Sequence, residues 1–118
     1  MKGQVEYLKK VRQLLGITGS VEISFCGEQD DAFPYSEVVW DRDITGYLIR
    51  INKKYKDNTF ICKTCLIHEC LEILYVKIRQ KFEKIQNINL DLGSLLLDKY
   101  VASLNEIEEI IYDYLEEK

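Results

Sequence analysis

The residues best placed for chemistry in this 118-residue chain are its single histidine, His68, and the nearby Glu69 and Glu72. If the segment is helical, His68 and Glu72 lie four residues apart on one face and can bind the same metal ion. Glu69 projects about 100° around the helix axis from His68, where it can reach a metal-bound water instead of the metal. This spacing indicates two metal ligands with a general base beside the water that they activate.

The sequence around these three residues is strongly apolar, from Cys65 through Leu74. Burying two carboxylates and an imidazole in such a helix is costly unless they are paired or bound to a metal ion. A helix that carries three such groups at its centre therefore predicts a functional site.

The nine residues at 66–74, Leu-Ile-His-Glu-Cys-Leu-Glu-Ile-Leu, resemble the His-Glu helix of small zincin-like metallopeptidases. In that family a second histidine stands where this chain has Glu72. The chain is similar to the minimal, single-domain members from phages and mobile elements, with residues 40–52 in the place of their hairpin and residues 100–104 in their final helix. The resemblance covers roughly residues 20–115, and its specific part is the central nine residues.

The resemblance implies a zinc-dependent peptidase in which His68 and Glu72 hold the ion and Glu69 is the catalytic base. A catalytic zinc site has three protein ligands, and with no second histidine the third must be an acid or a cysteine. Glu108 is our candidate, because it interrupts the apolar face that Leu104 gives to the last predicted helix. Its alternatives in the same helix are Asp98, Glu106 and Glu109.

Other interpretations stay open beside this one. Cys65, His68 and Glu72 share one helical face and would suit a structural metal site. A non-catalytic protein of the same fold would use its acidic C-terminal helix or exposed tyrosines to dimerise or to bind another protein. A redox pair at Cys62 and Cys65 is disfavoured, since such a motif follows a strand in a βαβ unit, which this sequence does not predict.

The elements that must position these residues follow from the periodicity of the apolar residues. Helices are predicted at residues 4–15, from about 59 to 84, and at 94–115. Strands are predicted at 21–25, 37–40 and 46–52, the last two forming an antiparallel hairpin, with loops or turns at 27–34, 41–46 and 85–93. This order predicts an α+β fold with an N-terminal helix, a short antiparallel sheet, a long central motif helix and a C-terminal helix.

Length and composition predict one domain over residues 1–118, with 47% hydrophobic residues to build its core. A net charge of −4 argues against a nucleic-acid partner. We expect the basic cluster of Lys77, Arg79, Lys81 and Lys84 to interact with a helix dipole. The absence of a membrane-length apolar run and of a signal-peptide core predicts a cytoplasmic protein with reduced cysteines. The expected partner is a peptide or protein, or a second copy in a homodimer.

Overall fold

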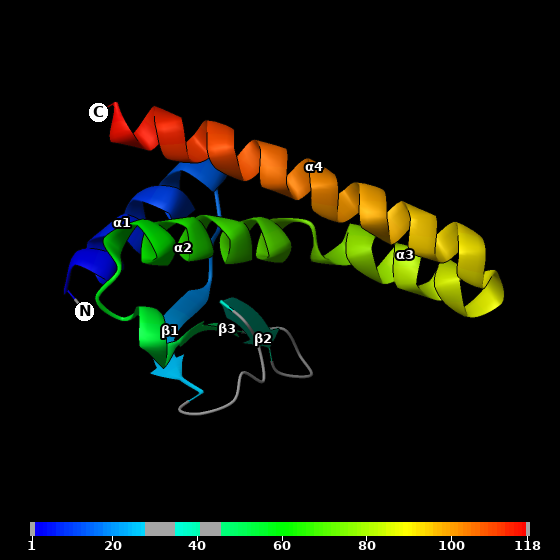
Figure 1. The fold of residues 1–118 in the computed structure, drawn as a ribbon, viewed down its shortest axis with the longest axis horizontal. Helices are drawn as coiled ribbons and strands as arrows, with labels where there is room; N and C mark the ends of the chain where they lie inside the picture. Colours follow the sequence, from blue (N-terminus) through cyan, green and yellow to red (C-terminus); the bar gives the residue numbers. More distant parts are fainter. Residues whose placement is uncertain (1, 28–34, 41–45, 118) are drawn as a thin grey trace.

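The fold combines four long helices with a small sheet, in a computed structural model that describes residues 2–27, 35–40 and 46–117. The α+β class predicted from the sequence is confirmed. The predicted segments at 28–34 and 41–45 lie outside the described residues. The elements, shown in Figure 1, are α1 (Lys2–Leu15), β1 (Ser20–Cys26), β2 (Ser36–Trp40), β3 (Gly46–Asn52), the short 3₁₀ helix η1 (Lys53–Tyr55), α2 (Thr59–Leu74), α3 (Val76–Ile88) and α4 (Leu90–Glu116).

Strand β3 is the centre of a three-stranded sheet with the order β1-β3-β2. The predicted antiparallel pairing of β2 with β3 is confirmed, with Val38 opposite Ile49. The prediction of a wholly antiparallel sheet is wrong, because β1 pairs with β3 in parallel and places Ile23 beside Ile49. Alternating polar and apolar residues identify a strand, but they do not determine which strand takes the central position.

Helix α2 is the centre of the hydrophobic core. It contacts α1, α4, β2 and β3, and nine of its residues are buried. Its first turn is capped by Asn58, whose side chain accepts a hydrogen bond from the amide of Ile61 at 3.0 Å. Because α2 is packed on several sides, its polar side chains must find partners on the surrounding elements.

The helix predicted from residue 59 to 84 is interrupted at Tyr75, whose φ of −107° and ψ of 17° are not helical. Hydrogen bonds nevertheless cross the break. The amide of Tyr75 donates to the carbonyl of Leu71, and the amide of Arg79 donates to the carbonyl of Tyr75. Helix α3 therefore follows α2 directly and extends beyond the sheet, where it lies along α4 (Figure 1).

Residues 85–93, predicted to be a loop, are helical except at Asn89. Asn89 ends α3 and caps α4, since its side chain accepts a hydrogen bond from the amide of Leu92 at 3.1 Å. Gly93 does not end a helix but lies inside α4, where a Cβ atom would stand 2.1 Å from the Cα atom of Gln86. This glycine marks the close approach of α3 and α4.

Helix α4 is oriented by apolar residues that face α2. Leu104 and Ile111 are buried in the core, and they lie four residues before and three residues after Glu108. Residues at these spacings share one helical face, so the packing of α4 directs Glu108 toward α2. Among the described helices, none is long and apolar enough to cross a membrane.

We expect the substitution Gly93→Ala to destabilise the protein by about 1–3 kcal/mol, because the added methyl group would force α3 and α4 apart. Urea unfolding followed by circular dichroism measures this change. Gly3→Ala is the matched control, since a Cβ atom at this helical position meets nothing within 4 Å. Equal stabilities of the two variants would contradict the assigned close approach.

Candidate functional site

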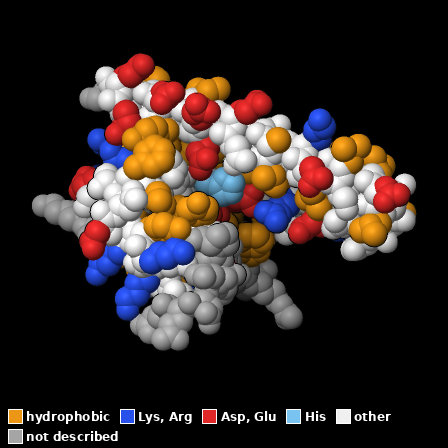
Figure 2. All heavy atoms as spheres, viewed as in Figure 1, with side chains coloured by type: hydrophobic (Ala, Val, Ile, Leu, Met, Phe, Trp, Pro, Cys, Tyr) orange, Lys and Arg blue, Asp and Glu red, His pale blue; other side chains and the backbone are white. Residues whose placement is uncertain are grey.

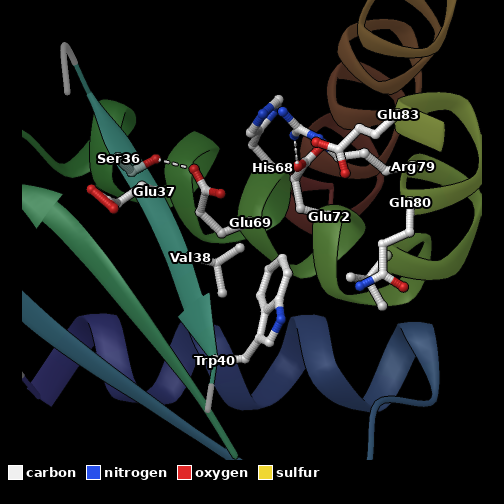
Figure 3. Close-up of a pocket in the computed structure, with 11 residues that line it drawn as sticks. Ser36, Glu37, Val38, Trp40, His68, Glu69, Glu72, Arg79, Gln80 and Glu83 are labelled. Atoms are coloured by element: carbon white, nitrogen blue, oxygen red, sulfur yellow. Dashed lines mark hydrogen bonds and ion pairs between the residues drawn. The ribbon is translucent and has the colours of Figure 1, made fainter. Parts of the chain in front are cut away.

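His68 and Glu69 line a cleft between β2, α2, α3 and α4. One part of the cleft, of about 430 Å³, is bounded by β2 and the first turns of α3. A second part, of about 730 Å³, lies between the N-terminal half of α2 and α4. Figure 2 shows the only histidine, in pale blue, within a hollow below α4, and Figure 3 shows the first part of the cleft from close by. Both cavities therefore meet at the two residues that the sequence singles out.

His68 and Glu108 are brought together from α2 and α4. The Nδ1 atom of His68 lies 3.7 Å from the Oε1 atom of Glu108, and the two side chains are 26% and 21% exposed. Burial lowers the pKa of His68 and raises the pKa of Glu108 to about 7. A neutral imidazole thus faces a carboxyl group that exchanges its proton near neutral pH. The alternatives Asp98, Glu106 and Glu109 are exposed on α4.

Glu69 is buried between α2 and β2, where the hydroxyl of Ser36 donates a hydrogen bond to its Oε2 atom at 2.5 Å (Figure 3). Burial raises the pKa of Glu69 to about 7, and the hydrogen bond from Ser36 acts in the opposite direction. A carboxyl group with this pKa can accept a proton and return it at neutral pH, which is what a general base requires.

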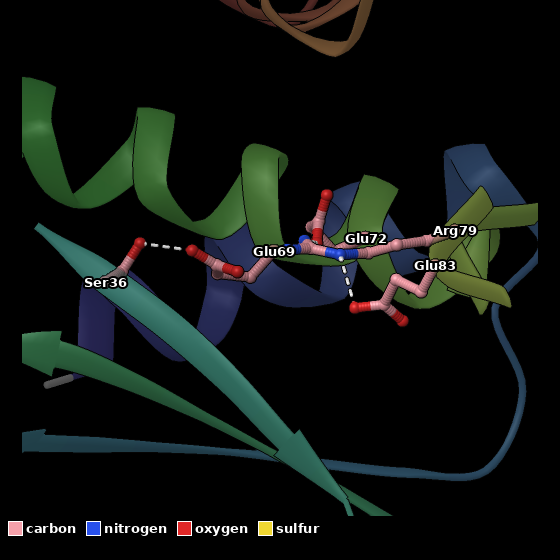
Figure 4. A network of polar contacts seen from close by, with 5 residues as sticks. All are labelled: Ser36, Glu69, Glu72, Arg79 and Glu83. Atoms are coloured by element: carbon pink, nitrogen blue, oxygen red, sulfur yellow. Dashed lines mark hydrogen bonds and ion pairs between the residues drawn. The ribbon is translucent and has the colours of Figure 1, made fainter. Parts of the chain in front are cut away.

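Glu72 is bound by Arg79, whose Nη1 atom donates to the Oε2 atom of the carboxylate. Figure 4 shows Arg79 near a second acid, Glu83, with 3.9 Å between the Nε atom of Arg79 and the Oε2 atom of Glu83. The prediction that Arg79 interacts with the dipole at the end of a helix is wrong, because α3 begins at Val76 and Arg79 lies in its first turn, where its guanidinium group pairs with side-chain carboxylates. The guanidinium group of Arg79 is therefore bound to Glu72, one of the two metal ligands predicted on α2.

The side chains of the cleft include atom types that bind zinc, and those of His68 and Glu108 already lie close together. His68 and Glu108 offer an imidazole nitrogen and a carboxylate oxygen, both of which zinc accepts. Among the described residues, however, no three His, Cys, Asp or Glu side chains are grouped to hold a metal ion. The third donor from α2 would be Glu72, which is paired with Arg79. A three-ligand site therefore requires Glu72 to exchange Arg79 for the metal.

Cys65 also lines the cleft, next to His68 and Glu69. Burial raises the pKa of its thiol to about 11. A zinc-binding cysteine must lose its proton, so the alternative site made of Cys65, His68 and Glu72 would need the metal ion to displace this proton.

Two residues of the site were not identified from the sequence. Ser36 precedes a predicted strand, and a serine at that place carries no distinguishing signal. Arg79 stands seven residues after Glu72, a spacing that returns to the same face after two helical turns. That spacing was the available signal, and the neighbouring lysines concealed it.

Comparison with known proteins adds little to this geometry. No family model and no curated protein matches the chain. The crystal structure of the metallopeptidase zymogen jannalysin from Methanocaldococcus jannaschii is similar at 13% identity, covering 81% of this chain and 88% of that chain with a TM-score of 0.42. A likeness at this level carries no argument about this chain.

The raised pKa of Glu69 predicts that stability falls as the pH rises. The folded protein binds this proton more tightly than the unfolded chain, whose glutamate has a pKa of 4.5, so the contribution is complete below that value and is lost as the pH passes about 7. We expect Glu69→Gln to reduce the fall of the unfolding free energy between about pH 5 and pH 8 by about 1–3 kcal/mol.

Denaturant unfolding at a series of pH values measures this difference. Glu106→Gln, at an exposed position of α4, should keep the pH dependence of the unsubstituted protein. The assignment is refuted if Glu69→Gln keeps it as well.

Proposed function

We propose that this protein is a metal-dependent hydrolase that cleaves peptide bonds in the cleft around His68. The observation that carries the proposal is the 3.7 Å approach of His68 to Glu108, with Glu69 following His68 directly in α2. A neutral imidazole and two acids whose pKa values lie near 7 are typical of a catalytic cleft and are costly to keep in a purely structural core.

The donor set favours zinc as the metal. His68 and Glu108 would hold it together with Glu72, once Glu72 has left Arg79. A bound zinc ion supplies Lewis acidity, which polarises a carbonyl group and makes a water molecule acidic near neutral pH. Since its ligands come from α2 and α4, metal binding would also join these two helices.

Glu69 is the residue that moves the proton in this proposal. The hydroxyl of Ser36 anchors one of its carboxylate oxygens and so fixes its orientation toward the cleft. With a pKa of about 7, Glu69 takes a proton from the attacking water and delivers it to the leaving amine nitrogen. Both transfers use the same carboxyl group.

The position of β2 favours a polypeptide as the substrate. Among the described strands, β2 pairs only with β3, so its other side forms an edge of the sheet. Ser36, Glu37 and Val38 of this strand line the cavity beside Glu69. An extended peptide can add to such an edge through main-chain hydrogen bonds, and its backbone would then pass Glu69.

A peptide-binding protein without metal is the second candidate, and the ion pair of Glu72 with Arg79 favours it. With Arg79 retained as the counter-ion, the cleft would hold a peptide on β2 without cleaving it. The two candidates differ in whether the purified protein binds zinc.

We expect the protein to bind about one zinc ion per chain, as a single catalytic site does. His68→Ala and Glu108→Gln should lose most of this binding, because each removes a ligand. Glu69→Gln should keep the ion and reduce hydrolysis of an unstructured protein such as casein at least about 100-fold. Isothermal titration with zinc and a fluorescent casein assay measure these effects.

Glu106→Gln is the control variant, since it removes an exposed acid two residues before Glu108 on α4 and should change neither zinc binding nor hydrolysis. Protein that is purified without chelator, contains no zinc and takes up none would exclude the hydrolase and leave the metal-free candidate.

A further inference from the structure

We propose that Arg79 is an internal competitor of the metal ion, which holds Glu72 in the metal-free protein and thereby sets the affinity for zinc. This inference rests on the proposed function, because it concerns the third ligand of the same site. It assigns a role in metal binding to a residue that is not itself a ligand.

The contact between Glu72 and Arg79 joins a buried group to a half-exposed one. The side chain of Glu72 is 11% exposed, whereas that of Arg79 is 41% exposed. A buried carboxylate needs a permanent partner. Arg79, in contrast, can turn toward solvent without being buried elsewhere. Exchange of the partner at Glu72 therefore requires movement of the arginine alone.

A place for the displaced guanidinium group already exists on α3. Glu83 lies four residues after Arg79, its Oε2 atom is 3.9 Å from the Nε atom of Arg79, and its side chain is 51% exposed. Figure 4 shows Arg79 reaching both acids. Arg79 can thus move from Glu72 to Glu83 by a change of side-chain conformation, without a movement of the helix.

Glu72 is a neighbour of His68 in the proposed metal site even before a metal ion binds. Residues four apart on a helix share one face, and His68 and Glu72 line the same cavity. Glu72 therefore lies near His68 even though its carboxylate is bound to Arg79. A short reorientation of this side chain would add it to His68 and Glu108.

The charge balance favours exchange when the metal is present. Arg79 brings one positive charge and compensates Glu72, while Glu108 faces a neutral imidazole. A divalent ion brings two positive charges and can compensate both carboxylates at once. Arg79 thus stabilises the metal-free state, and its pairing with Glu72 must be broken before a three-ligand site forms.

The test is a zinc titration of the chelator-treated full chain and its variants by calorimetry. We expect Arg79→Gln to bind zinc at least about tenfold more tightly than the unsubstituted protein, because the competing cation is gone. Glu83→Gln should bind zinc more weakly, since displaced Arg79 loses its second partner. Lys77→Gln is the matched control, removing an exposed cation from the same helix with no change in affinity.

Thermal unfolding gives a second measurement. Without zinc, Arg79→Gln should unfold at a lower temperature, since Glu72 is left without its partner, and added zinc should raise that temperature more than in the unsubstituted protein. Arg79→Lys keeps the charge but loses the planar guanidinium group, so its zinc affinity should lie between those of the unsubstituted protein and Arg79→Gln. This variant replaces Arg79→Gln in the test if Arg79→Gln does not fold.

The outcomes separate this inference from the proposed function. If the unsubstituted protein and Arg79→Gln bind zinc equally well, the inference is overturned and the hydrolase stands. If neither binds zinc, both are overturned. If Arg79→Gln binds zinc and the unsubstituted protein does not, Arg79 is established as the group that keeps the metal out. The unsubstituted protein is then a metal-free peptide-binding protein, which is the second candidate function.

Discussion

The cost of burying charge along α2 is the constraint on which the site depends. This helix fills the core with Leu66, Ile67 and Leu71, yet the same two turns carry His68, Glu69 and Glu72. Each of these groups loses most of its hydration when α2 packs, so each must meet a polar partner from another element or change its protonation state. Both responses occur here: Glu69 is partnered by Ser36 and has a raised pKa, and Glu72 is paired with a cation.

This constraint explains why the site is assembled from elements far apart in the sequence. Strand β2 brings Ser36, α3 brings Arg79, and α4 brings Glu108, one partner for each of these three residues of α2. The partners are positioned by features that have no chemical role, such as the antiparallel pairing of β2 and the close approach of α3 and α4 at Gly93. The cleft therefore depends on the whole fold, and loosening either feature would move a partner away from α2.

The sequence predicted the parts of this arrangement that depend on local periodicity. Spacing along a helix placed His68, Glu69 and Glu72 correctly on α2. The acid on the apolar face of α4 pointed to Glu108, which lies 3.7 Å from His68, while its role as a metal ligand stays a prediction. The sequence did not predict the parallel pairing of β1, the break at Tyr75 or the helical conformation at Gly93, since each depends on contacts between elements. The partner of Glu72 was missed for a different reason, because Arg79 stands among several lysines and its seven-residue spacing from Glu72 did not distinguish it from them.

A glutamate at position 72 has a consequence that a histidine would not have. A neutral imidazole can bind a metal ion but attracts a guanidinium group only weakly, whereas a buried carboxylate attracts any cation within reach. The negative charge that makes Glu72 a strong potential ligand is thus also the reason why Arg79 binds it in the absence of metal. Glu72, which stands where the His-Glu-x-x-His pattern has its second histidine, and the arginine one turn into α3 are therefore physically linked. Under the proposed function, they would together make zinc binding an exchange between two cations, whose outcome would depend on how much zinc is available.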